Sequence, residues 1–191
     1  MKKISIMLLI VMIMSVSWAQ NRGGARTDEF FETTEEFLDS GADIDGVFVD
    51  PDDSYENADG MTWLMYVAAL NYSASAQLLI DAGADLEAGD NDDWTALMWA
   101  TWGASVETLE VLLEAGADPD AVDVWGCTAL MHVSTCYDDD YAEEYVEIAQ
   151  LLIDYGADVN ISDDEGYTAL DYAADDDIFD IVDLLEDAGA Y

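Results

Sequence analysis

Carboxylates dominate the side chains of this chain that could do chemistry. The 191 residues include 44 Asp and Glu but 4 Lys and Arg, and His132 is the one histidine. Paired carboxylates can hydrolyse glycosides when the two groups lie at the required separation. With this many acids, some pair will lie at that separation whatever the function is. A carboxylate-based hydrolase is therefore an alternative that the pattern permits without favouring it.

Other catalytic and cofactor-binding patterns are missing from the sequence. It contains no G-x-S-x-G motif, no P-loop and no H-E-x-x-H motif. From Thr27 onward there is no Lys or Arg that could stabilise an oxyanion or a phosphate. His132 fits a packed side chain better than a catalytic base. We therefore expect no enzyme activity, no catalytic residue and no cofactor.

One acidic segment partly follows the ligand spacing of a calcium-binding loop. The pattern begins at Asp158 and continues with Asn160, Ser162 and Asp164. The glycine that an EF-hand loop needs at its sixth position and the glutamate that closes the loop are both absent. We expect no dedicated metal site here, and diffuse weak binding of divalent cations is the alternative.

The two cysteines, Cys127 and Cys136, look at first like the disulfide pair of an exported protein. A helix predicted to begin at Thr128 lies between them, and nine helical residues separate the two Cα atoms by roughly 13 Å. Cα atoms joined by a disulfide lie within about 7 Å of each other. We therefore expect two unpaired thiols, and the same distance argues against a metal site shared by the pair.

The first nineteen residues have the pattern of a secretory signal peptide. Two early lysines precede an almost unbroken apolar run over residues 4–16, and the small residues Ser17 and Ala19 stand at positions −3 and −1 of a cleavage site. The alternative, an uncleaved membrane anchor, needs a longer apolar run. We predict cleavage after Ala19, a flexible leader over residues 20–27, and a mature protein that is periplasmic or secreted and has no membrane anchor.

Two short signatures recur along the rest of the chain. The tripeptide Gly-Ala-Asp starts at Gly41, Gly83, Gly116 and Gly156, and Gly-Ala-Tyr ends the chain from Gly189. The intervals between these glycines are 42, 33, 40 and 33 residues. The pattern Thr-x-Leu keeps step with them, starting at Thr62, Thr95, Thr128 and Thr168.

A period of 33 residues with these start and end signatures resembles the ankyrin repeat. The resemblance implies an all-α solenoid of stacked helix-turn-helix units. We expect four full repeats at about 60–89, 90–122, 123–162 and 163–191, preceded over residues 28–59 by a capping helix (Asp28 to Asp39) and an acidic loop (Gly46 to Asp59). The predicted helix pairs are Thr62–Leu70 with Ala74–Ala82, Thr95–Trp102 with Val106–Ala115, and Thr168–Ala174 with Ile178–Ala188. The third repeat gains seven residues between its helices, and its second helix ends near Tyr155.

The departures from the family pattern concern the loops. In the family a histidine three residues after the threonine cross-links the loops by hydrogen bonds. Here that position holds Met65, Met98, Met131 and Asp171. Because a thioether cannot supply that network, we expect softer loops between repeats, held more by apolar packing than by side-chain hydrogen bonds.

The charge balance limits the partners. Nucleic acid is excluded because a polyanion would be repelled by this chain, and anionic membrane surfaces are disfavoured for the same reason. An apolar content of 52% shows that the chain can bury a core and is not a disordered acidic tail. The acidity could serve a cationic partner or simply solubility.

In ankyrin repeats the loop tips and first helices form the concave binding face, and aromatic residues occur at these positions of the sequence. Rings interleaved with carboxylates suit a cationic ligand, through cation–π contacts and ion pairs. The alternative is that these rings pack against adjacent repeats, as we expect for Trp99 and Tyr66. The predicted partner-binding residues are Trp94, Trp125, Tyr167, Trp102, Asp92 and Glu165.

The sequence therefore predicts a non-enzymatic exported scaffold, monomeric, that binds a protein or peptide of basic character. A second interpretation is an acidic exported protein that buffers cations or keeps a surface soluble without any specific protein partner. The carboxylate-based hydrolase is the third.

Overall fold

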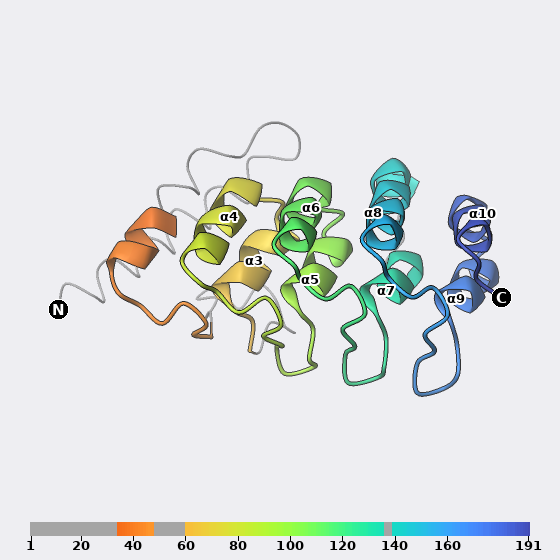
Figure 1. The fold of residues 1–191 in the computed structure, drawn as a ribbon, viewed down its shortest axis with the longest axis horizontal. Coiled ribbons are helices and arrows are strands. Elements are labelled where there is room, and N and C mark those ends of the chain that lie inside the picture. The colour runs from red at the N-terminus through yellow and green to blue at the C-terminus, as the bar shows by residue number, and fades with distance from the viewer. Residues whose placement is uncertain (1–33, 48–59, 136–138) are drawn as a thin grey trace.

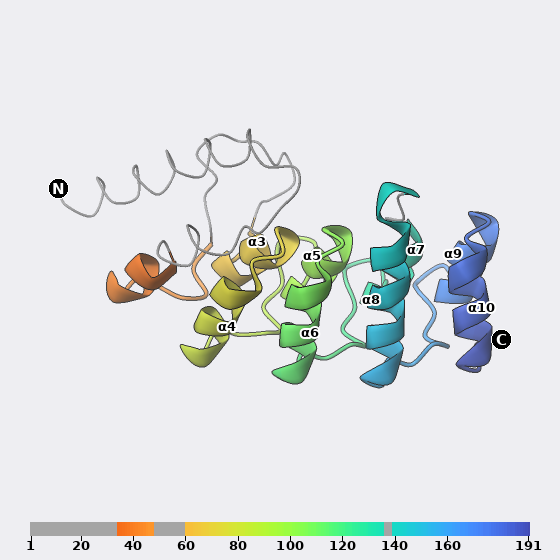
Figure 2. The same ribbon diagram turned by 90° about the horizontal axis from the view of Figure 1, so that it is seen from above.

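Four pairs of antiparallel helices make up most of the described chain. The computed structural model describes residues 34–47, 60–135 and 139–191. The first helices, α3, α5, α7 and α9, form one row, and the second helices, α4, α6, α8 and α10, form a parallel row (Figures 1 and 2). The pairs are α3 (Trp63–Ala69) with α4 (Ser73–Asp81), α5 (Ala96–Trp102) with α6 (Val106–Glu114), α7 (Ala129–Thr135) with α8 (Ala142–Asp154), and α9 (Ala169–Asp175) with α10 (Phe179–Asp187).

Each first helix begins where the sequence places a threonine cap. The hydroxyl oxygen of Thr62 accepts a hydrogen bond from the N–H of Met65 at 3.4 Å, and the same bond recurs at Thr95, Thr128 and Thr168. A hydroxyl at this position satisfies one of the free amides of the first turn. These bonds confirm the predicted starts of the first helices.

Each second helix ends before a glycine in the left-handed region. Gly116, for example, has φ +97°, and Gly83, Gly156 and Gly189 adopt nearly the same value. The N–H of Gly116 then donates to the carbonyl of Leu113, and the next N–H donates to Leu112. Glycine reaches this conformation without a Cβ clash, so the recurring Gly-Ala-Asp signature sets the helix ends as predicted.

The insertion in the third repeat lengthens α8, as expected. This helix has 13 residues, whereas the other second helices have nine, and a 3-10 turn over Asp139–Tyr141 precedes it. The added first turn buries Tyr145, whose hydroxyl donates to the carbonyl oxygen of Trp102 at 3.2 Å. The insertion therefore reaches back to the preceding repeat.

The core runs the length of the stack between neighbouring helices. Leu64, Leu97 and Leu130 are at most 2% exposed and lie at equivalent positions of three first helices. At the N-terminal end, residues 34–39 are helical, and the ring of Phe37 stacks on Trp63 with a centroid distance of 5.1 Å. This is the described part of the predicted capping helix, and it closes one end of the core.

Several predictions fall on residues outside the described ranges. They concern the signal peptide, the leader, the start of the capping helix, nearly all of the acidic loop, and Cys136. Within the described ranges, no helix is both long enough and apolar enough to cross a membrane.

Candidate functional site: the loops and first helices

A buried aspartate organises each of three long loops, which descend from the same side of the helices (Figure 1). These are the 84–94, 117–127 and 157–167 loops, and their aspartates are Asp90, Asp123 and Asp163, each at most 8% exposed. In each loop, Oδ1 of the aspartate accepts hydrogen bonds from the backbone N–H groups two and four residues later in the chain. The two backbone hydrogen bonds to each carboxylate oxygen hold the loop in a tight turn.

The second oxygen of each aspartate bonds to a ring nine residues onward, on the following first helix. Trp99 donates its Nε1–H to Asp90 at 3.0 Å, and the hydroxyl of Tyr172 donates to Asp163. The Nε2 of His132 lies 2.8 Å from Oδ2 of Asp123. The carboxylate therefore ties each loop to the helix that follows it.

These bonds contradict the expectation that side-chain hydrogen bonds contribute little to holding the loops. The methionines Met98 and Met131 do lie in the core, each 1% exposed. However, the hydrogen-bonding role has moved to the next residue, where Trp99, His132 and Tyr172 stand. The prediction that apolar packing mainly holds the loops is therefore wrong, because side-chain hydrogen bonds replace those of the missing histidine.

The three aspartates differ in their ionisation. Burial raises the pKa of Asp90 above 3.8, and its hydrogen bonds from Trp94, Asp92 and Trp99 do not offset this. Burial also pushes the pKa of Asp123 upward, but hydrogen bonds from His132 and from the amides of Cys127 and Trp125 together lower it below 3.8. The pKa of Asp163 is lowered in the same way, with burial opposed first by the Tyr172 hydroxyl.

Acidic and amide side chains also join successive repeats. The backbone N–H of the third residue of each Gly-Ala-Asp or Gly-Ala-Tyr tripeptide donates to a side-chain carboxylate or amide oxygen of the preceding repeat or, at the first repeat, of the N-terminal segment. The four bonds are Asp85 N to Asp45 (2.9 Å), Asp118 N to Glu87 (2.9 Å), Asp158 N to Asp120 (2.8 Å) and Tyr191 N to Asn160 (3.3 Å). A part of the negative charge is thus bonded to backbone amides rather than to cationic side chains.

The calcium-like segment belongs to this scheme. Oδ1 of Asp158 accepts the N–H of Asn160 at 3.0 Å, and the Asn160 amide oxygen accepts from Tyr191. These oxygens therefore face backbone donors. In the part of the chain that the structure describes, no group of three or more His, Cys, Asp or Glu is arranged to hold a metal ion.

Trp94 lies between two repeats. It is half-buried, and its ring centroid is 5.2 Å from that of Trp99 and 4.3 Å from that of His132. The equivalent residue one repeat later, Cys127, is a free half-buried thiol that shares a hydrogen bond with Tyr172. At two of the four positions before a threonine, the residue thus contacts the ring on the next first helix.

The other predicted rings are more open to solvent. Trp125, at the tip of the 117–127 loop, is 54% exposed, and Tyr167 is 43% exposed beside Tyr172. Trp102, at the end of α5, is 42% exposed and meets the edge of Trp99 at 5.7 Å. Trp99 itself is 7% exposed, which confirms that it packs inward.

The structure thus divides the six predicted residues among three places. Trp94, at the end of the 84–94 loop, and Trp102 join Trp99 of α5 and His132 of α7 in one cluster of rings. Trp125, Asp92 and Glu165 lie exposed at three neighbouring loop tips. Tyr167 lies at the C-terminal end of the row, beside Tyr172.

Sequence reasoning missed the role of the ring nine residues after each loop aspartate and the two exposed valines Val122 and Val124. The aspartate spacing was visible in the sequence as Asp90–Trp99, Asp123–His132 and Asp163–Tyr172. It could have identified the first of these features, since a buried carboxylate needs a donor.

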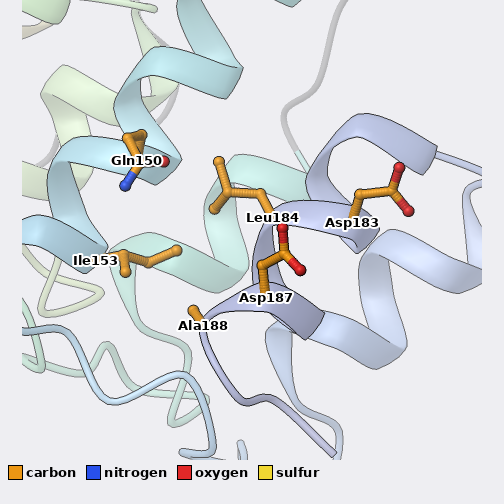
Figure 3. Close-up of a pocket in the computed structure, with 6 residues that line it drawn as sticks. All are labelled: Gln150, Ile153, Asp183, Leu184, Asp187 and Ala188. Carbon is orange, nitrogen blue, oxygen red and sulfur yellow. The ribbon is translucent and has the colours of Figure 1, made fainter.

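A separate hollow lies between the second helices α8 and α10. Ile153, Leu184 and Ala188 form its apolar side, and the carboxylates of Asp183 and Asp187 lie beside them (Figure 3). Its remaining lining residue, Gln150, already donates its amide to Asp154 at 2.8 Å. Apart from these two carboxylates the lining contains no nucleophile and no base, so this hollow offers less chemistry than the loop and first-helix surface.

Comparison with known proteins agrees with this architecture. The family model for ankyrin repeats (3 copies) matches residues 25–123 and 116–191. None of the curated proteins with which the sequence was compared matched it. Ankyrin repeats generally mediate protein–protein interactions, and proteins built from them are typically non-enzymatic scaffolds. Because the matches extend over more than half of its length, the chain belongs to the ankyrin-repeat family.

Proposed function

We propose that this chain is an exported, non-enzymatic scaffold that binds a basic protein or peptide. Its binding surface is the face made by the three loops and the first helices, hereafter the inner face. The observation that carries the proposal is the exposure of Trp102, Trp125 and Tyr167 on a body that has no Lys or Arg beyond Thr27. Asp92 and Glu165 are exposed on the same face.

The chemistry of this face matches a cationic ligand. An ammonium or guanidinium group is attracted to the face of an indole or phenol ring. Nearby carboxylates add ion pairs and accelerate the encounter of oppositely charged partners. The fixed loops help because a preorganised surface loses little entropy on binding. An anionic partner would meet repulsion over the whole surface.

A selection experiment tests the proposal. A random peptide library displayed on phage is panned against the purified chain beginning at Gln20, at low salt and again at high salt. The expected result is enrichment of Lys- and Arg-containing peptides whose binding weakens as salt rises. Enrichment of neutral or acidic peptides, or binding that strengthens with salt, would contradict it. Calcium binding at many weak equivalent sites without any selected peptide would instead favour a cation-buffering protein.

Export is part of the proposal and has its own test. The charged start, the apolar run over residues 4–16 and the small residues at 17 and 19 support cleavage after Ala19. The intact mass of the protein recovered from its own exported fraction should correspond to a chain that begins at Gln20. A product that retains Met1 and stays embedded in a membrane would contradict export as a soluble protein.

A further inference from the structure

The 117–127 loop differs from its two neighbours at three exposed positions. Val122, Val124 and Trp125 are 48%, 45% and 54% exposed. They stand one residue before, one after and two after the buried Asp123. At the same positions around Asp90 and Asp163, the neighbouring loops carry Gly89, Asn91 and Asp92, and Ser162, Asp164 and Glu165. An apolar patch is thus exposed on this loop where the neighbouring loops are polar or acidic.

Backbone hydrogen bonds hold this patch in a fixed place between the neighbouring loops. The N–H of Val124 donates to the carbonyl of Asp92 at 3.1 Å, and the carbonyl of Trp125 accepts from Asp164 at 3.0 Å. The N–H of Trp125 also donates to Oδ1 of Asp123 at 2.9 Å. The patch is therefore preorganised, and it costs little ordering entropy on binding.

Exposed carboxylates lie on both sides of the patch. Asp92 and Asp93 are exposed on the 84–94 loop, and Asp164 and Glu165 are exposed on the 157–167 loop. Along the row of three loop tips, the exposed side chains are therefore acidic, then apolar, then acidic. A partner of complementary charge has a basic, an apolar and a basic side chain in the same order.

We propose that Val122, Val124 and Trp125, the valine–tryptophan patch, bind one apolar side chain of an extended segment in the partner, with a basic residue on each side of it. This inference rests on the proposed function and specifies the sequence that the partner presents. The repeats of a second copy do not fit, because they present carboxylates and have no Lys or Arg. An anionic membrane surface is repelled for the same reason.

The spacing of the repeats sets the spacing of the partner's residues. Neighbouring packed helices lie about 8–10 Å apart, and an extended chain advances about 3.3 Å per residue. One repeat therefore corresponds to about three residues of an extended segment. The segment that matches has the pattern basic-x-x-apolar-x-x-basic and crosses the three loop tips along the stack.

Two capped peptides of identical composition test this pattern. The first, R-S-T-L-T-S-R, places its arginines three residues on either side of leucine, and the second, L-S-T-R-R-T-S, places leucine at one end. Affinity is measured by fluorescence anisotropy against the chain beginning at Gln20 at low salt. Burying a leucine only in the first complex should make the first peptide bind about tenfold more tightly. Equal affinities, or failure of the first peptide to bind, would overturn the inference.

Three variants separate this patch from the rest of the inner face. Trp125→Ser and Val124→Asn introduce polar residues, the second copying Asn91 of the neighbouring loop, and both should abolish the preference for the first peptide. Trp102→Ala is the control, because Trp102 is exposed on α5 rather than on a loop. It should leave the preference unchanged. Thermal unfolding should be similar for all three, which would exclude loss of the fold.

The possible results also distinguish this inference from the proposed function. If Trp102→Ala weakens both peptides while Trp125→Ser leaves the preference intact, the inner face binds basic ligands but the patch does not choose among them. If panning selects no basic peptide at all, the proposed function fails first, and the inference fails with it.

Discussion

Asp90 and Asp123 occupy equivalent positions in successive loops and yet have pKa values shifted in opposite directions. Each accepts two backbone amides, but the third partner of Asp90 is the neutral indole of Trp99, whereas that of Asp123 is an imidazole. The burial that raises both pKa values therefore prevails at Asp90 and is outweighed at Asp123. The same loop geometry thus gives two different dependences of stability on pH.

Urea unfolding of Asp123→Asn and Asp90→Asn, followed by tryptophan fluorescence between pH 7 and pH 2, tests this difference. Asp123 has a lowered folded pKa, so its contribution to the free energy of unfolding is present above 3.8 and is lost as pH falls through the folded value. The deficit of Asp123→Asn, about 2 kcal/mol at pH 7 for lost bonds to a charged group, should therefore shrink in acid.

Asp90 serves as the matched control with the opposite sign. Its folded pKa is raised, so its contribution is greatest below 3.8 and is lost as pH rises through the folded value. The deficit of Asp90→Asn should therefore grow in acid. Parallel pH profiles for the two variants would contradict the assigned shifts.

Cys127 should react slowly in the folded protein. Burial, followed by the carboxylates of Asp123 and Asp163, raises the pKa of its thiol to about 11. Because the thiolate is the reactive form, little of it exists at pH 8. Iodoacetamide labelling at pH 8, mapped by mass spectrometry, should modify Cys127 readily only after unfolding in denaturant.

The same mapping tests the prediction that the two cysteines are not linked. The helix α7 begins just after Cys127 and continues to Thr135, as the distance argument requires. Unreduced, unfolded protein should therefore take up two labels. A 127–136 crosslinked peptide, two hydrogens lighter than the reduced form, would contradict both the free thiols and the helix.

At the scale of helices and loops, neighbouring repeats approach closely at Gly103. A Cβ atom built there would lie 2.1 Å from the carbonyl oxygen of Ala69 on α3. Ser105 donates a hydrogen bond to the same oxygen at 3.3 Å, so the contact joins the first two repeats. Gly103→Ala should lower the free energy of unfolding by about 1–3 kcal/mol, because backbone must shift to relieve the overlap.

A substitution at the next residue is a control that should change the free energy of unfolding in the opposite direction. Ala104 adopts φ +49°, where a residue with a Cβ costs roughly 1–2 kcal/mol. Ala104→Gly should therefore raise the free energy of unfolding or leave it unchanged, although it alters the same turn. Both variants are compared with the parent by urea unfolding. A loss of stability in Ala104→Gly equal to that in Gly103→Ala would show that the turn, rather than the overlap, is sensitive.

The helices could be predicted from the sequence because their signals are local. A threonine cap such as Thr95 and a terminal glycine such as Gly116 act within one turn, and both are visible in the sequence. The bonds between Asp90 and Trp99, and between Asp45 and Asp85, join separate elements. Comparison with the family pattern led to the opposite expectation, that few side-chain hydrogen bonds hold the loops. The exposure of Trp125 and the packing of Trp94 likewise depended on how adjacent repeats stack.

At the scale of the whole molecule, the dominant property is the formal charge of −40. Backbone amides satisfy some carboxylates, but a hydrogen bond does not remove their charge. Among the described residues, His132 and Asp123 form an ion pair only when the histidine is protonated. Self-repulsion should therefore oppose the compact state, and its effect should decrease wherever counter-ions screen the surface.

Salt should consequently act in opposite directions on the free protein and on its complex. Raising NaCl from about 10 to 200 mM shortens the screening length from roughly 30 Å to less than 10 Å, so the Tm of the free protein should rise. Over the same range the Kd of its complex with R-S-T-L-T-S-R should increase, because attraction between unlike charges is screened too. Differential scanning fluorimetry and anisotropy measure the two quantities on one sample series.

Magnesium chloride at matched ionic strength separates screening from cation binding. If screening alone is responsible, MgCl2 and NaCl should raise the Tm to a similar extent, whereas a larger effect of MgCl2 would indicate diffuse binding of divalent ions to the carboxylates. A Tm that falls with salt would contradict self-repulsion as a destabilising force. A Tm that rises while the Kd stays constant would show that the acidity affects solubility and stability only. It would also show that charge does not contribute to binding of the partner.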